Sequence, residues 1–162
     1  MKELAKHWLT FADKDRQTCE QLKDMPGLRT IAAFHVQQMI EKSLKAILVC
    51  QDRNPPRIHD LARLAALVTA TTGELVVDTD ELERINQYYT LSRYPQALET
   101  DGSDEPSGLE IDAMVSTGRK ILVQARQLME RAPASEHESG TDTDESGDPH
   151  RAGPVIGSGD GE

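Results

Sequence analysis

Residues 29–51 read RTIAAFHVQQMIEKSLKAILVCQ, and the other elements of the fold are predicted around them. The apolar residues of this stretch recur at the spacing of three and four that is typical of an α-helix. The first part of this helix is apolar around most of its circumference, so we expect it to serve both the core and an interface. The sequence Asn54-Pro55-Pro56 ends it, because the residue before a proline is disfavoured in the helical region.

Four further helices are predicted around this one. Residues 4–22 place one mostly apolar stripe at helical spacing, and the break at 25–27 ends that helix. A third helix runs from about His59 to Thr72-Gly73, and capping-box patterns at 78–81 and 107–110 begin the last two. The stripe of the first helix consists of Leu4, Trp8, Phe11, Asp15, Cys19 and Leu22. Five helices with short links predict an all-α fold, an antiparallel up-down helical bundle.

Charge divides the chain into two parts. The whole sequence has 18 Lys+Arg against 28 Asp+Glu and a formal net charge of −10. Residues 132–162 hold eight of these acids and one base, which leaves only −3 for residues 1–131. Because this last segment has almost no large apolar residues, we expect a disordered acidic tail behind a bundle domain of residues 1–131. Such a tail aids solubility or shields a basic partner surface.

Composition excludes several classes of protein. The sequence contains no run of 18 apolar residues, so no transmembrane helix is expected. The first residues lack the apolar region of a secretory signal. We therefore expect a cytoplasmic protein without a membrane partner. A near-neutral domain without a basic run is not expected to bind duplex DNA. Cys19 and Cys50 are expected to be reduced thiols, and no metal or cofactor motif is present among the two Cys and five His.

Four motifs, in this order and at these intervals, resemble the HEPN domain family. They are AAFHVQQMIEKSLKA at 32–46, PPRIHDL at 55–61, INQYY at 85–89 and SRYP at 92–95. The resemblance covers roughly residues 2–131. It implies a helical bundle that dimerises, often encoded beside a minimal nucleotidyltransferase in a toxin–antitoxin-like context. Many members of the family are metal-independent ribonucleases, and others are non-catalytic and bind nucleotides or act as scaffolds.

The ribonuclease motif of that family is incomplete in this sequence. Ribonuclease members carry an arginine followed after four to six residues by a histidine, near the fourth helix. Arg93 matches the arginine, but the residues from Tyr94 to Thr100 contain no histidine. The resemblance therefore favours a protein without this enzymatic activity, and no residue is assigned a catalytic role.

Five residues are candidates for binding a nucleotide or phosphate: Arg93, Tyr94, Tyr89, His59 and His35. The planar guanidinium of Arg93 suits bidentate contact with a phosphate, and a tyrosine can stack on a base. Alternatives stay open for each of them. Arg93 can cap helix carbonyls and the tyrosines can seal the end of the bundle, whereas His59 can fix the start of a helix and His35 can lie in the core or at a dimer face.

The polar residues of the central helix have a simple interpretation. Gln37, Gln38, Glu41 and Lys42 can equally form a solvated face instead of a binding site. Glu41 and Lys45 form an i,i+4 ion pair that contributes a few tenths of a kcal/mol.

The sequence therefore predicts a dimeric module that binds a nucleotide, single-stranded RNA or a partner protein, and that is associated with a minimal nucleotidyltransferase. One alternative is a metal-independent ribonuclease toxin in which Arg93 holds the phosphate and His35 or His59 transfers the proton. The other is a non-catalytic structural scaffold.

Overall fold

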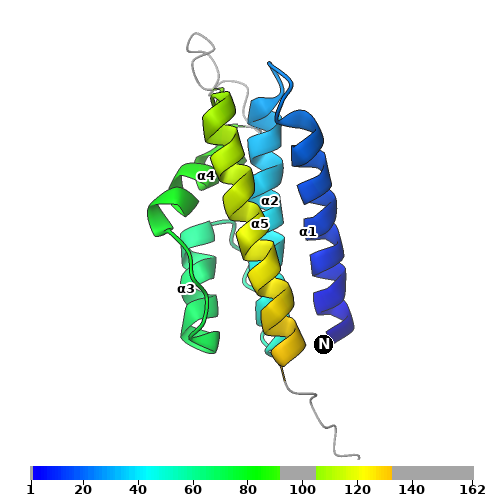
Figure 1. The fold of residues 1–162 in the computed structure, drawn as a ribbon. Helices are drawn as coiled ribbons and strands as arrows, with labels where there is room; N and C mark the ends of the chain where they lie inside the picture. The colour runs from blue at the N-terminus through cyan, green and yellow to red at the C-terminus, as the bar shows by residue number, and fades with distance from the viewer. Residues whose placement is uncertain (1, 92–104, 133–162) are drawn as a thin grey trace, which may run out of the picture.

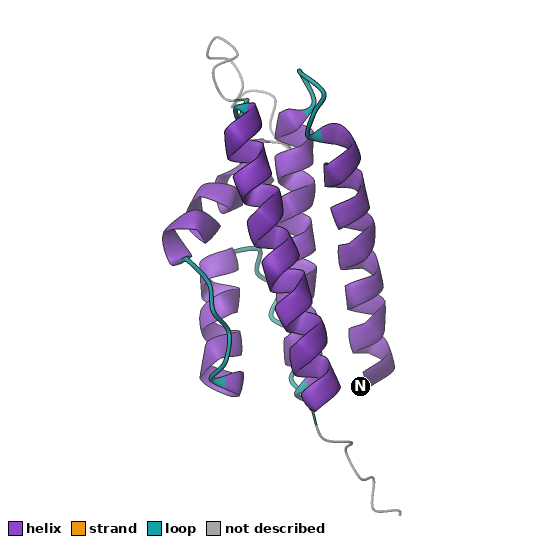
Figure 2. Cartoon of the chain, in the orientation of Figure 1, coloured by secondary structure: helices purple, strands orange, loops and turns teal. Residues whose placement is uncertain are grey.

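The computed structural model of the chain describes residues 2–91 and 105–132 (Figure 1). This part of the chain forms five α-helices and no strand (Figure 2). They are α1 (Lys2–Leu22), α2 (Arg29–Cys50), α3 (Leu61–Thr72), α4 (Thr79–Leu91) and α5 (Gly108–Arg131). The predicted all-α bundle is confirmed, whereas the expected tail of residues 132–162 lies outside the described residues except for Ala132. Within the described ranges, no helix is long and apolar enough to cross a membrane.

The central helix α2 packs against each of the other four helices. Figure 1 shows α1, α2 and α5 running side by side, with the shorter α3 and α4 on the side of the bundle away from α1. Fifteen of the 22 residues of α2 are buried, among them Met39, Ile40 and Leu44. This explains why its sequence is apolar around most of the helix.

A glycine lets α5 approach α2 closely. A Cβ atom built on Gly118 would collide with the side chain of Met39 and come within 3.3 Å of Val36. The absence of a side chain at this one position of α5 therefore allows α2 to keep a large core residue opposite it.

Local hydrogen bonds fix where α3 and α5 begin. The carboxylate of Asp60 accepts a hydrogen bond from the backbone N–H of Arg63 at 3.0 Å, which makes Asp60 the N-cap of α3. Ser107 and Glu110 form the predicted capping box of α5. The third helix thus begins two residues later than predicted, because Asp60 has extended backbone geometry. His59 therefore lies in the loop before the cap.

Only part of the stripe on α1 enters the core. Of its residues, Asp15 and Cys19 are buried, together with Ala5 and Ala12 from the rest of α1. Leu4 and Phe11 remain 50% and 54% exposed. The outer face of α1 therefore keeps apolar surface next to α2.

Candidate functional site

The structure brings two of the predicted site residues together. His59 comes from the loop between α2 and α3, and Tyr89 from the last turn of α4. Their rings stack with centroids 4.4 Å apart and planes 18° from parallel. The stack forms because α3 and α4 pack against each other on the same side of α2.

A buried carboxylate on α2 holds the imidazole of His59. Both side-chain oxygens of Glu41 lie 3.1 Å from Nδ1 of His59. The same carboxylate accepts hydrogen bonds from Nζ of Lys45 at 2.8 Å and from Nε2 of Gln37 at 3.1 Å. Gln37 also donates to the backbone carbonyl of His59 at 3.1 Å, which fixes the loop itself. Glu41 is thus the centre of a cluster that joins α2 to the loop before α3.

This cluster keeps Glu41 ionised at neutral pH. Burial acts to raise the pKa of Glu41, but the hydrogen bonds from Lys45 and His59 outweigh it, so the pKa lies below the ordinary value of 4.5. An ionised carboxylate only accepts hydrogen bonds, so the hydrogen that it shares with the imidazole belongs to Nδ1 of His59. The tautomer of a neutral His59 is therefore fixed by Glu41.

The second ring nitrogen of His59, Nε2, takes no part in the contact with Glu41. The side chain of His59 is 48% exposed, whereas that of Glu41 is 6% exposed. Nε2 lies on the far side of the ring from the Nδ1 that Glu41 holds. It accepts a proton or hydrogen bond when the ring is neutral, and donates to an anion when the ring is protonated. Such a histidine suits phosphate binding and also proton transfer.

The burial of Gln37 and Glu41 corrects the sequence interpretation. These two residues do not lie on a solvated face, since they are 0% and 5% exposed, whereas Gln38 and Lys42 of the same set are half-buried. The i,i+4 pair of Glu41 with Lys45 is present, but it lies inside the bundle, with Lys45 only 6% exposed, because the other four helices pack around α2. Helical periodicity does not distinguish a polar residue on a surface from one buried beneath a neighbouring loop.

His35 lies in a different cluster, between α1 and α2. Its Nδ1 is 2.9 Å from Oδ1 of Asp15, and the other oxygen of Asp15 pairs with Lys42. Asp15 is 8% exposed, so this cluster ties two helices together beneath the surface. His35 is thus not grouped with His59 and Tyr89.

Arg93 and Tyr94 lie outside the described residues, so their assignment stays a prediction. Within residues 2–91 and 105–132, no group of three or more His, Cys, Asp or Glu side chains is placed to hold a metal ion. The residues that sequence reasoning missed are Glu41, Gln37 and Lys45. The one available signal was the i,i+4 pair in an otherwise apolar helix.

The described residues define the class of protein, an all-helical domain built around one central helix. The family model of the HEPN domain matches residues 5–132. The chain therefore belongs to the HEPN domain family, as its motifs predicted.

Two solved structures share this fold. TT1696 from Thermus thermophilus aligns with a TM-score of 0.67 at 21% identity, over 76% of this chain and 97% of that chain. ST0689, an archaeal HEPN homologue, aligns with a TM-score of 0.56 at 22% identity, over 77% of this chain and 97% of that chain. At these identities the likeness shows the fold alone. No curated protein matches the sequence.

Proposed function

We propose that this HEPN protein binds the phosphate of a nucleotide or of single-stranded RNA through His59. The observation that carries the proposal is the half-exposed imidazole whose Nδ1 is held by the buried carboxylate of Glu41. When the ring is protonated, its Nε2 donates a hydrogen bond to an anion, and the stacked ring of Tyr89 adds an aromatic surface beside it. An aromatic surface next to a hydrogen-bond donor is the arrangement that single-stranded nucleic acids favour.

Arg93 is proposed as the second phosphate ligand. It follows Tyr89 by four residues in the chain, and a guanidinium binds two oxygens of one phosphate. Arg93 would then supply a permanent positive charge to the phosphate, and His59 would supply a directional hydrogen bond.

The test is the affinity of the full chain for a fluorescein-labelled single-stranded RNA, measured by fluorescence anisotropy. A hydrogen bond to a charged group contributes about 1.5–3 kcal/mol, so His59→Ala and Arg93→Ala should each raise Kd by about 10- to 100-fold. Binding should weaken as salt is raised, because phosphate contacts release counterions.

Arg131→Ala is the matched control for this experiment. Arg131 pairs with Glu74, which follows the end of α3 that lies farthest from His59. Its substitution also removes one positive charge, but it should leave Kd within about twofold of the wild-type value because exposed pairs contribute little. An unchanged Kd in a folded His59→Ala protein would contradict the assignment.

The same geometry supports a second candidate function, metal-independent cleavage of RNA. A carboxylate-held imidazole is the arrangement of a general base. Nε2 of His59 would take the proton of a 2′-hydroxyl as its oxygen bonds to phosphorus and the bond to the 5′-oxygen breaks. The 5′-oxygen then takes a proton from water. Cleavage of cellular RNA in EDTA that is abolished by His59→Ala would support this function, and intact RNA at high protein concentration would contradict it.

We also propose that the chain is a homodimer and pairs with a minimal nucleotidyltransferase. Membership in the HEPN family supports both parts of this proposal. Light scattering after size-exclusion chromatography tests the dimer, and co-elution with a nucleotidyltransferase encoded by the neighbouring gene tests the pair. A monomer that elutes alone in both measurements would contradict it.

A further inference from the structure

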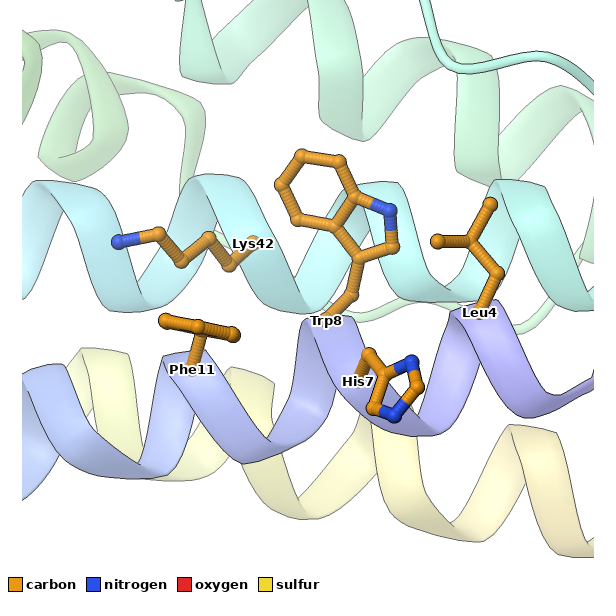
Figure 3. Close-up of a pocket in the computed structure, with 5 residues that line it drawn as sticks. All are labelled: Leu4, His7, Trp8, Phe11 and Lys42. Carbon is orange, nitrogen blue, oxygen red and sulfur yellow. The ribbon is translucent and has the colours of Figure 1, made fainter.

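A groove on the outer face of α1 and α2 is lined almost entirely by apolar atoms. It has a volume of about 340 Å³. Figure 3 shows Trp8 between Leu4 and Lys42, with Phe11 next to the aliphatic chain of Lys42 and His7 at the edge. Leu4 and Phe11 are half exposed, so the groove is open along its length. An open apolar slot of this kind marks a place where another chain segment docks.

Positive charge borders this apolar slot. Nζ of Lys14 lies 4.7 Å from the centroid of the Phe11 ring, and Lys42 lines the groove itself. Lys42 is partly neutralised by the buried Asp15, but Lys14 is exposed. The chemistry therefore fits an acidic segment that carries a small apolar element. A second copy docked groove to groove would place lysines against lysines.

Residues 133–162 of this chain have that chemistry. They contain eight acids and one lysine or arginine, Arg151. Their only Val, Ile, Leu, Met, Phe, Tyr or Trp residues are the adjacent Val155 and Ile156. A neighbouring pair of branched apolar residues within an acidic sequence matches an apolar slot with a basic edge.

The segment also starts next to the groove. Nζ of Lys2 donates a hydrogen bond to the carbonyl of Ala132 at 3.4 Å. Ala132 and Met129 pack against the same small apolar cluster as Trp8, around Ala5, Val49 and Cys50. The chain thus leaves α5 at the end of α1 that carries Leu4.

The chain length is sufficient to reach the groove. Val155 follows Ala132 by 23 residues, and the root-mean-square span of a random coil of that length is about 26 Å. Leu4 and Phe11 are separated by only about 10 Å along α1. Tethering at this length gives a local concentration in the millimolar range, so even weak docking is populated.

We propose that Val155 and Ile156 dock into the groove of their own chain, with the surrounding acids facing Lys14 and Lys42. The acidic segment then acts as an intramolecular competitor for any acidic partner of this face. The groove shares no lining residue with the His59 site, although Nζ of Lys45, the partner of Glu41, lies 5.8 Å from the centroid of the Trp8 ring. The proposal does not depend on nucleotide or RNA binding.

Trp8 is the single tryptophan of the chain and lines the groove, so its fluorescence reports the docked state. The experiment measures acrylamide quenching of the full chain and of the double variant Val155→Asp/Ile156→Asp. Undocking should raise the quenching constant by about twofold. The matched control, Ala152→Asp/Ser158→Asp, adds the same two charges but keeps the apolar pair, and it should quench like the wild type.

A charge-reversal variant and the dependence on protein concentration distinguish docking of Val155 and Ile156 from docking of a second copy. Lys14→Glu should also raise quenching, because it reverses one charge at the edge of the groove. Equal quenching in the wild type and in Val155→Asp/Ile156→Asp would overturn the proposal. A quenching constant that falls with rising protein concentration and is the same in the wild type and the tail variants would also overturn the proposal, since that result places a second copy in the groove.

Discussion

Removing the carboxylate of Glu41 should destabilise the protein far more than an ordinary helix ion pair would. The substitution Glu41→Met keeps a similar volume but removes the acceptor for Lys45, Gln37 and His59. The ammonium group of Lys45 would then be left without its counter-ion on a side chain that is only 7% exposed. Breaking a buried pair in this way costs about 3–5 kcal/mol, compared with a few tenths for an exposed i,i+4 pair.

The double variant Glu41→Met/Lys45→Met distinguishes this explanation from a general packing defect. It removes both charges, so no unpaired ion remains inside the bundle. The amide of Gln37 still loses one acceptor but keeps the carbonyl of His59. We expect the double variant to be about 1–2 kcal/mol less stable than the wild type, and so more stable than Glu41→Met alone.

The assay is urea unfolding of the full chain at pH 7, followed by circular dichroism at the helix band. With a slope of about 1.5 kcal/mol per molar urea, Glu41→Met should lower the midpoint by about 2–3 M. A loss below about 1 kcal/mol would refute the buried-pair reasoning. A double variant as unstable as the sum of both single variants would refute it as well, because the two sites would then act independently.

The pH dependence of the free energy of unfolding tests the same carboxylate independently. The pKa of Glu41 is lower in the folded protein than its ordinary value of 4.5. Its contribution to stability is therefore complete above pH 4.5 and is lost as the pH falls below that value. The free energy of unfolding should decline less steeply below pH 4.5 in Glu41→Met than in the wild type. Equal slopes would contradict this assignment.

Three other predictions concern the scaffold. Gly118→Ala should destabilise the bundle by about 1–3 kcal/mol in thermal unfolding, because the added methyl meets Met39, and an unchanged melting temperature would contradict this. Hydrogen bonds, of which the one from Arg16 has the largest effect, lower the pKa of Asp13 to about 2. The stabilising effect of this carboxylate should therefore be complete above pH 3.8 and be lost as the pH falls from 3.8 towards 2. Asp13→Asn should remove the loss of stability that occurs in this pH range. Burial raises the pKa of the Cys19 thiol to about 12. A disulfide reagent should therefore modify Cys19 far more slowly in the native protein than in the urea-unfolded protein, and equal rates would refute this prediction.

Most of the fold was predictable because it depends on local signals. The apolar coverage of residues 29–51, the proline break after them and the capping boxes each act over a few residues. The late start of α3 was missed because Asp60, rather than His59, takes the cap. That choice depends on backbone geometry which the sequence pattern does not encode.

The candidate site was predictable only in part. His59 and Tyr89 were singled out by motif, and the structure stacks them. The role of Glu41 was hidden because its partner His59 lies 18 residues away and meets it only through the path of the loop. Periodicity also favoured exposure of Glu41, since burial of an ion pair depends on which helices cover α2.

In the proposed site, Glu41 holds His59 so that Nε2 faces a phosphate. The most direct measurement is a titration of the full chain, labelled with ¹⁵N in its imidazole rings, with a single-stranded RNA, and His59→Gln assigns the resonance. We expect the Nε2 signal of His59 to shift on binding, while its Nδ1 keeps its hydrogen and the signals of His35 stay unchanged. RNA binding that leaves the Nε2 signal of His59 in place would contradict it.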